Sequence, residues 1–286
     1  MNGKTVLVTG ANSGMGKATV AALADMGAAV VMLCRSEERG RQALDEIIQQ
    51  PGRNVRLMLC DLGSMKSIRS FAQQFKAECG QLDVLINNAG VITLDRRETA
   101  DGLELQFGVN HIGHFMLTLL LLTLLKKSSD GRIVMVGSGA HKVGKLYFDD
   151  YNLKKYNVVK AYGQSKLANL LFVRELDRRL KARGIPIVVN CAHPGAVATQ
   201  MGVDRNTHFG KSIVAVLKPF FLTPEQGART AVYLASKDAD GVSGQYFYKC
   251  KIAADSKRSR DVAAAERLFA LSEHICGITF EEACTE

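Results

Sequence analysis

The sequence predicts an α/β fold, a single doubly wound parallel sheet of about seven strands with helices on both faces. Short β-branched runs alternate with helix-length segments along the whole chain. The first six runs are almost entirely apolar, as expected for parallel strands covered by helices on both sides. We find no linker, repeat or low-complexity tract. Residues 1–286 are therefore expected to form one domain.

The expected strands are followed by helix-length segments in each case but the last. Their ranges are 5–8, 28–33, 55–59, 82–87, 132–136, 185–190 and 244–248. The longest apolar run, "FMLTLLLLTLL" at 115–125, is too short to span a bilayer and indicates a buried helix. We therefore expect no transmembrane segment.

Composition excludes several classes of protein. Hydrophobic content is 47% with 23% charged residues, which is typical of a globular domain. The net charge of +9 suits anionic ligands, but the densest basic stretch, "KRSR" at 257–260, is short, so no nucleic-acid partner is expected. Seven cysteines without a CxxC pair, and no secretory leader, favour a cytoplasmic location.

A glycine-rich segment, "TGANSGMG" at 9–16, directly follows the first strand and precedes a helix. Glycines at 10, 14 and 16 allow a tight turn and let the backbone approach a pyrophosphate at the positive end of that helix. The spacing differs from G-x-G-x-x-G, so the prediction depends on the strand–turn–helix context. This segment predicts a dinucleotide site.

The end of the second strand indicates which dinucleotide binds. NAD sites usually place a carboxylate there for the ribose hydroxyls, whereas this strand ends at Cys34 followed by Arg35. Arg35, helped by Arg39, is suited to pairing with the 2′-phosphate of NADP(H). Alternatively, Arg35 is a solvated surface residue and Ser36 simply caps the next helix.

Several motifs in chain order resemble those of the short-chain dehydrogenase/reductase superfamily, which has a Rossmann-type fold. Besides the glycine-rich segment, they are "CDL" at 60–62, "NNAG" at 87–90, "VNHIGHF" at 109–115 and "HPGAVAT" at 193–199. Within that superfamily, "LCRS", "AYGQSKLANLLFVREL" and "TPEQGA" most resemble the retinol dehydrogenase-like group. That resemblance implies an oxidoreductase that interconverts alcohols and carbonyls using NADP(H).

The resemblance also implies roles for single residues. Ser138 would hydrogen-bond the substrate carbonyl, and Asn110 would hold a water in a proton relay. Tyr162 would be the acid/base, and Lys166 would bind the nicotinamide ribose and favour the ionised tyrosine. The implied cofactor contacts are Gly10, Asn12, Ser13, Gly14, Met15, Gly16, Arg35, Arg39, Asp61, Leu62, Asn88, Ala89, Gly90, Tyr162, Lys166, Pro194, Gly195, Val197 and Thr199.

The pattern Tyr-x-x-x-Lys also occurs at Tyr151/Lys155 and Tyr156/Lys160, so the pattern alone does not identify the acid/base tyrosine. Counting forward from Ser138 favours Tyr151, whereas counting back from Pro194 favours Tyr162. An insertion between Ser138 and the tyrosine resolves the conflict. Residues 141–157 have the Gly, Asp and Asn content of a loop, where an insertion is expected, whereas 161–184 is predicted to form one helix. In a helix, residues four apart share a face. We therefore predict Tyr162 with Lys166, ahead of Tyr151 and Tyr156.

The substrate and the partners are less fixed by the sequence. The apolar segment 200–222 occupies the position of a variable substrate lid, which predicts a hydrophobic alcohol, aldehyde or ketone, although an ordinary amphipathic helix is the alternative. The extension 251–286 matches no motif. Pairing into a homodimer or homotetramer is expected through helices at about 101–127 and 160–183. The histidines at 111, 114, 141 and 193 are interpreted as packing or loop residues, with no metal site.

Two other functions share these motifs. One is a double-bond reductase of the protochlorophyllide reductase kind, and the other is a regulator that senses NADP without turnover. The presence of Ser138, Tyr162, Lys166 and Asn110 disfavours the regulator, because a sensor needs no acid.

Overall fold

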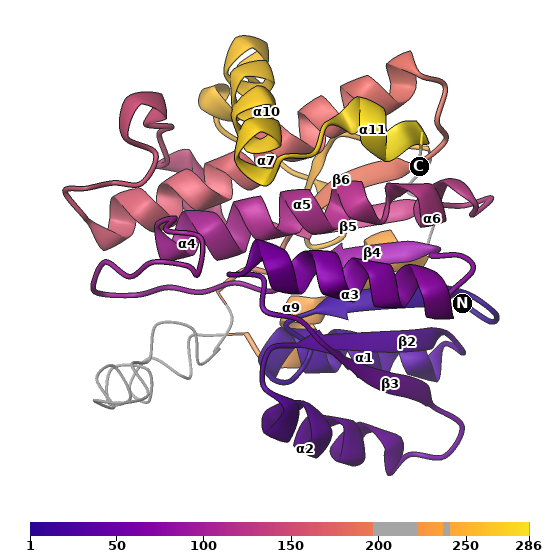
Figure 1. Ribbon diagram of the computed structural model, residues 1–286. Coiled ribbons are helices and arrows are strands. Elements are labelled where there is room, and N and C mark those ends of the chain that lie inside the picture. The colour runs from indigo at the N-terminus through magenta and orange to yellow at the C-terminus, as the bar shows by residue number, and fades with distance from the viewer. Residues whose placement is uncertain (197–221, 237–240, 286) are drawn as a thin grey trace.

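A computed structural model of the chain describes residues 1–196, 222–236 and 241–285 (Figure 1). The described strands form one sheet in the order β3-β2-β1-β4-β5-β6-β7-β8. They are β1 (Thr5–Thr9), β2 (Ala29–Cys34), β3 (Asn54–Leu59), β4 (Val84–Asn87), β5 (Arg132–Val136), β6 (Val188–His193), β7 (Tyr246–Tyr248) and β8 (Lys251–Ile252). All neighbouring pairs are parallel except β7 and β8. The predicted doubly wound fold is confirmed.

The short strand β8 was not predicted. It returns from β7 through Lys249 and Cys250, which both have the positive φ angles, 50° and 60°, of a two-residue hairpin turn. The sixth strand begins three residues later than predicted, because Pro186 lies in the segment before it, where 185–187 run as a connection. Neither difference changes the order of the predicted strands.

Helices cover both faces of the sheet. On one face α3, α5 and α7 pack over the strands, and on the other face α1, α2 and α9 do so. The helices are α1 (Gly14–Asp25), α2 (Glu37–Ile48), α3 (Met65–Glu78), α4 (Leu105–Phe107), α5 (Gly113–Leu120), α6 (Leu122–Lys126), α7 (Val158–Ala182), α9 (Pro224–Ser236), α10 (Val262–Cys276) and α11 (Phe280–Thr285). Short helical turns are η1 (Gly108–Ile112, a π-helix), η2 (Gly139–Lys142), η3 (Phe148–Asp150) and η5 (Lys257–Arg260).

The apolar run at 115–125 forms α5 and most of α6, and all but two of its residues are buried. Over the residues that the structure describes, no helix combines the length and the apolarity needed to cross a membrane. The buried helix predicted for this run is confirmed, although Leu121 interrupts it.

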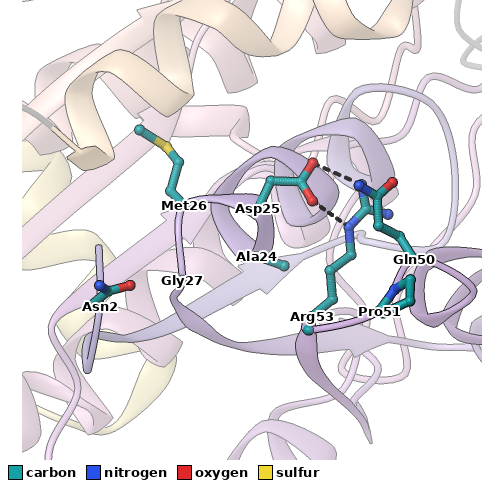
Figure 2. A pocket seen from close by; sticks show the side chains of 9 residues that line it. Asn2, Ala24, Asp25, Met26, Gly27, Gln50, Pro51 and Arg53 are labelled. Atoms are coloured by element: carbon teal, nitrogen blue, oxygen red, sulfur yellow. Dashed lines mark hydrogen bonds and ion pairs between the residues drawn. The ribbon is translucent and has the colours of Figure 1, made fainter.

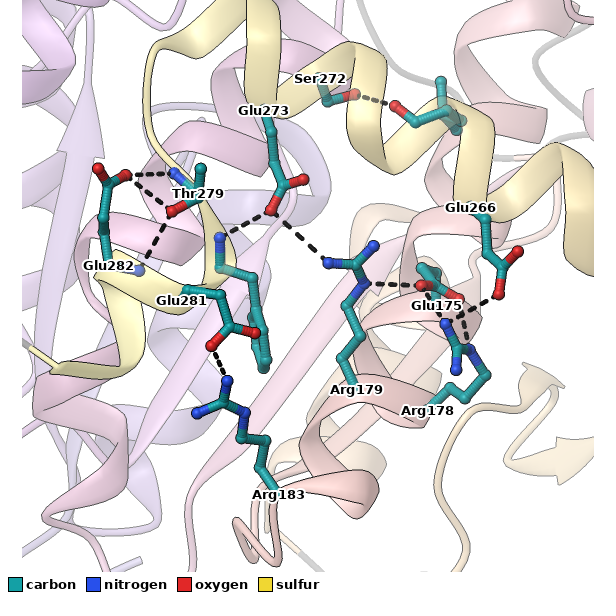
Figure 3. Close-up of polar contacts among 12 residues, drawn as sticks. Glu175, Arg178, Arg179, Arg183, Glu266, Ser272, Glu273, Thr279, Glu281 and Glu282 are labelled. Atoms are coloured by element: carbon teal, nitrogen blue, oxygen red, sulfur yellow. Dashed lines mark hydrogen bonds and ion pairs between the residues drawn. The ribbon is translucent and has the colours of Figure 1, made fainter.

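The described part of the extension, residues 251–285, packs back onto the domain, with α10 crossing α7 and α11 lying against α6 (Figure 1). Phe269 of α10 packs against both Phe115 and Phe172, with ring centroids 4.9 Å and 6.0 Å away, and those two rings also contact each other. Ion pairs between α7 and the last two helices frame this contact, among them Arg179 with Glu273 at 3.7 Å (Figure 3). The extension therefore covers part of the helix surface through which pairing between copies was expected. The oligomeric state stays a prediction.

The direction in which the chain adds strands reverses between β1 and β4. From β1 the chain adds β2 and β3 toward one edge of the sheet, and it then crosses back to add β4 on the other side of β1. At such a point the loops after adjacent strands diverge and leave a crevice at the carboxyl edge, where ligands bind in this kind of fold. Most of the predicted site residues follow the carboxyl ends of β1, β2, β3, β4, β5 and β6. The predicted lid, residues 200–222, lies outside the described residues apart from Leu222.

Candidate active site

The glycine-rich turn after β1 is packed tightly against the residues that follow β4. Gly10 has φ +63°, and a Cβ there would come 2.8 Å from the Cα of Ala89. A Cβ on Gly16 would lie 2.3 Å from the carbonyl oxygen of Gly10. Larger residues at 10 and 16 would force the turn open. Both glycines are thus required for the loop to keep this close approach.

Thr9 joins the two loops. Sequence reasoning did not predict a role for it, although it is the first residue of the segment "TGANSGMG". Its hydroxyl oxygen accepts hydrogen bonds from the backbone N–H groups of Asn88, at 2.9 Å, and Ala89, at 2.8 Å. It lies 2.9 Å from Nε2 of His114, whose Nδ1 contacts the carbonyl oxygen of Asn110 at 3.0 Å. An Nδ1–H tautomer satisfies every one of these contacts, with the Thr9 hydroxyl as donor to Nε2.

Asn88 supports the glycine-rich turn from the other side. Its Nδ2 donates to the carbonyl oxygens of Thr9, at 2.7 Å, and Gly10, at 3.3 Å. The amide protons of the Asn88 side chain are therefore used within the protein. A contact of Asn88 with the cofactor stays a prediction, and Oδ1 is the side-chain atom left for it.

The N-terminus of α1 is open to an anion. The helix begins at Gly14, its N-cap residue Ser13 makes no side-chain capping bond, and no acidic residue occupies its first turn. Its first amide groups and the positive end of the helix dipole thus remain for a pyrophosphate. Asn12 is half-buried and Ser13 exposed, whereas the side chain of Met15 packs against the core, so only the backbone of Met15 faces this position.

The carboxyl end of β2 carries no carboxylate. Cys34 is buried there, and burial raises the pKa of its thiol to about 11, which keeps the thiol neutral. Arg35 follows as an exposed residue, and we find no ion pair to it within the described part of the chain. Ser36 caps α2 by accepting from the backbone N–H of Arg39 at 3.4 Å. The helix-cap prediction is confirmed, and it leaves the guanidinium of Arg35 available.

The remaining predicted cofactor contacts lie on neighbouring loops. Asp61 accepts a hydrogen bond from the N–H of Gly63 at 2.9 Å, and Leu62 is buried beside η1. Gly90 is half-buried after β4. Pro194 is half-buried, and Gly195 after β6 has φ +82°. Val197 and Thr199 lie outside the described residues.

Tyr162 and Lys166 lie on α7, one turn apart. The ammonium group of Lys166 is 5.8 Å from the ring centroid of Tyr162 and donates to the carbonyl oxygen of Val136, the last residue of β5, at 3.1 Å. Lys166 is only 3% exposed. The lysine therefore has a fixed position between the sheet edge and the tyrosine ring, as a preorganised site requires.

Ser138 and Asn110 complete the predicted group. Ser138 lies two residues beyond Val136, caps η2 by accepting from the N–H of Ala140 at 3.2 Å, and is half-buried. Asn110 is fully buried in the π-helix η1, and its Nδ2 donates to Val91 at 3.0 Å and to Ser165 at 3.1 Å. Both amide protons of Asn110 are therefore taken, so a relay water would have to be held by another of its atoms.

The two look-alike tyrosines lie outside α7. Tyr151 and Tyr156 belong to the segment before Val158, which has no regular helix beyond η3, so the spacing of four residues does not place their lysines on a shared helix face. The hydroxyl of Tyr156 donates to the carbonyl oxygen of Thr93 at 2.5 Å and accepts from Gln106 at 2.6 Å. It anchors a loop. The helix predicted at 161–184 is confirmed, and it contains Tyr162.

A hollow of about 460 Å³ lies at the opposite edge of the sheet, between the turns that lead into β2 and β3 (Figure 2). The ion pair of Asp25 with Arg53, at 2.7 Å and 2.8 Å, borders it. It is remote from the glycine-rich turn and from Tyr162. The candidate active site is therefore the carboxyl edge.

The glycine-rich turn, the buried lysine beside a tyrosine and the adjacent serine all lie at the carboxyl edge of a doubly wound sheet, an arrangement that can hold a dinucleotide beside an acid/base group. Comparison with known proteins agrees, since the short chain dehydrogenase family matches residues 4–209. The chain belongs to the short-chain dehydrogenase/reductase family, within its retinol dehydrogenase-like group.

Among its relatives, retinol dehydrogenase 14 of Mus musculus is 45% identical over 97% of this chain and 87% of its own length. Retinol dehydrogenase 13 of Homo sapiens is 42% identical over 96% of this chain and 85% of its own length. A solved structure from Mycobacterium paratuberculosis has a TM-score of 0.79 and 35% identity, covering 98% of this chain and 95% of that one. A short chain dehydrogenase from Shigella flexneri, solved in complex with NADP, has a TM-score of 0.69 and 26% identity, covering 86% and 97%.

Proposed function

We propose that this oxidoreductase uses NADP(H) to interconvert a hydrophobic alcohol and its aldehyde or ketone, with Tyr162 as the acid/base. The observation that carries the proposal is the placement of Lys166 between the carbonyl oxygen of Val136 and the ring of Tyr162. The Ser138 turn follows the same strand as Val136, and the glycine-rich loop follows β1 at the same edge of the sheet, which supports a shared site. The glycine-rich turn suits a dinucleotide, because Gly10 and Gly16 let it fold tightly against the loop after β4 and the first turn of α1 holds no acidic residue that would repel a pyrophosphate.

The chain's own groups divide the work as follows. Ser138 donates a hydrogen bond to the substrate oxygen and orients it, and Tyr162 delivers a proton to that oxygen during reduction or removes one during oxidation. Lys166 holds the ribose side of the site and stabilises negative charge on the phenol oxygen. When bound, the nicotinamide supplies or accepts the hydride.

The choice of NADP(H) rests on the end of β2. A neutral Cys34 and an exposed Arg35 replace the carboxylate that would bind the ribose hydroxyls of NAD and repel a 2′-phosphate. Two related structures, from Shigella flexneri and from Escherichia coli CFT073, contain NADP and NADPH respectively, which supports the same choice.

A panel of hydrophobic and small polar aldehydes and ketones, each with NADPH or NADH, tests the proposal by the absorbance of the reduced nicotinamide. We expect turnover of hydrophobic carbonyls with NADPH. Turnover restricted to conjugated carbon–carbon double bonds would instead indicate a double-bond reductase. Tight NADPH binding without turnover of any compound would indicate a sensor.

A further inference from the structure

His193 ends β6 directly beside the turn that carries Ser138. The carbonyl oxygen of Ala192 accepts from the N–H of Gly137 at 2.9 Å, which fixes the two strand ends together. A Cβ built on Gly139 would lie 3.7 Å from Nε2 and 3.9 Å from Cε1 of His193. The edge of the imidazole is therefore next to the backbone that follows Ser138.

There is room for a ligand group at this place. Apart from the chain neighbours of Gly139 and the backbone of its own helical turn η2, the described residues put only atoms of His193 within 4 Å of that Cβ position. By contrast, a Cβ on Gly137 would meet the sulfur of Cys191 at 2.5 Å. The glycine after Ser138 thus opens a space that is bordered by the serine turn on one side and by the imidazole on the other.

The ring of His193 is held in one orientation. It stacks on Tyr246 with centroids 5.8 Å apart and an angle of 16°, and it lies 4.9 Å from Tyr248. Its Nδ1 accepts a hydrogen bond from the N–H of Gly195 at 3.4 Å. A neutral ring with Nδ1 as acceptor carries its proton on Nε2. That N–H has no hydrogen-bond partner among the residues described, and the ring is only half-buried.

Burial, with the nearby charges of His141, Lys142 and Lys166, lowers the pKa of His193 to about 4. The ring is consequently a neutral donor near neutral pH. Nδ1 of His141 donates to the carbonyl oxygen of Ser138 at 2.7 Å, so its buried Nε2 carries no proton and cannot donate, although it has no partner among the described residues. Both nitrogens of His114 have partners.

We propose that Nε2–H of His193 donates a hydrogen bond to the oxygen-bearing end of the substrate, beside Ser138, so that His193 orients the carbonyl for proton transfer. The inference rests on the proposed function and refines our interpretation of His193 as a packing or loop residue. It adds a side-chain donor to those of Ser138 and Tyr162 at the substrate oxygen. A substrate with a hydrogen-bond acceptor at or next to the reacting carbon is the class that this site favours.

The test compares wild-type protein with His193→Phe and His193→Gln, using NADPH with decanal and with benzaldehyde. Phenylalanine keeps the aromatic stack on Tyr246 and Tyr248 but has no donor, whereas the amide nitrogen of glutamine can take the place of Nε2. We expect kcat/KM to fall by about tenfold in His193→Phe, the loss of one neutral hydrogen bond. In His193→Gln we expect it to stay within about threefold of wild type. The Kd of NADPH, measured by fluorescence, should be unchanged in both variants.

Three results would overturn the role of His193 in an active protein. They are an unchanged kcat/KM in His193→Phe, a fall of equal size in His193→Gln, and a rise in the Kd of NADPH that accounts for the loss. The second would indicate ring packing, and the third a role in the cofactor loop. If wild-type protein reduces no carbonyl at all, the proposed function fails first, and the role of His193 fails with it. A His274→Asn variant, changed at an exposed histidine of α10, controls for handling.

Discussion

Lys166 donates a hydrogen bond to the carbonyl oxygen of Val136 at 3.1 Å, and this single contact ties α7 to the carboxyl end of β5. The two residues are 30 positions apart, and the intervening chain includes Ser138 and the loop with Tyr151 and Tyr156. Because the ammonium is buried, the bond fixes where the lysine can act. The tyrosine ring 5.8 Å away is the one that shares its helix.

Thr9 offers a test of the link between the two cofactor loops. Thr9→Val keeps the shape but leaves two backbone N–H groups and His114 without their partner, which we expect to destabilise the fold by about 2–4 kcal/mol. The affinity for NADPH should fall as well, because the glycine-rich turn loses its support. Urea unfolding and NADPH fluorescence measure both effects. Thr9→Ser, which retains the hydroxyl, should be close to wild type, and equal losses in both variants would refute the hydrogen-bonding role.

Arg35 should determine the choice between NADPH and NADH. In Arg35→Ala, we expect the KM for NADPH to rise by about 10–100-fold, because a charge-assisted contact with the 2′-phosphate is lost, while the KM for NADH changes little. Steady-state kinetics with both cofactors measure this. Arg41→Ala is the matched control, since Arg41 pairs with Glu37 on the exposed side of α2, the helix that follows Arg35. Equal KM changes for the two cofactors would exclude a 2′-phosphate contact.

Buried histidines should make the protein less stable below neutral pH. Burial lowers the pKa of His111 to about 3 and that of His114 to about 4, whereas an unfolded histidine titrates near 6.5. As the pH falls below 6.5, the unfolded chain takes up protons that the folded chain does not. Each histidine should therefore cost about 2 kcal/mol of stability by pH 5.

Urea unfolding between pH 7 and pH 5 measures how steeply the free energy of unfolding falls with pH. Asp83 and Glu175 also have shifted pKa values. Burial raises the pKa of each carboxyl, but hydrogen bonds outweigh burial and lower it. Their contribution to the free energy of unfolding is therefore lost only as the pH falls below about 4.5. His111→Asn should show a shallower loss than wild type over this range. His274→Asn should show the wild-type slope, and a slope unaffected by His111→Asn would contradict the argument.

The C-terminal extension should contribute strongly to stability. Phe269→Ala removes a ring that is 1% exposed and packed between α5 and α7, so we expect a loss of about 3–5 kcal/mol. Val262→Ala, at a residue of the same helix that is 58% exposed, should cost less than about 0.5 kcal/mol. Denaturant unfolding compares them, and similar small effects would mean that α10 adds little to the domain.

Much of this architecture was accessible from the sequence because it depends on local pattern. The apolar runs predicted the parallel strands, and the loop-like composition of 141–157 correctly separated Tyr156 from the helix that holds Tyr162. Contacts between distant segments were not accessible. Nothing in the local sequence shows that Phe269 fills a gap beside Phe115, or that Thr9 holds the N–H groups of residues 79 and 80 positions later.

The roles of single polar residues were likewise only partly predictable from the sequence. A motif identifies Asn88 and Asn110, but only the fold shows that their amide protons are spent on backbone and side-chain partners within the protein. His193 could not be distinguished from the other histidines by sequence, because its exposure depends on how β6 and β7 meet the turn after Ser138.

The central claim is that Tyr162, supported by Lys166, is the proton donor of an NADP(H)-dependent carbonyl reductase. The most direct measurement is the kcat of Tyr162→Phe with NADPH and a hydrophobic aldehyde. Tyr151→Phe is the matched control, and the Kd of NADPH is measured for each variant. We expect kcat to fall by about 10²–10⁴-fold in Tyr162→Phe, with NADPH still bound and with Tyr151→Phe as active as wild type. Full activity in Tyr162→Phe, or loss of activity in Tyr151→Phe alone, would contradict it.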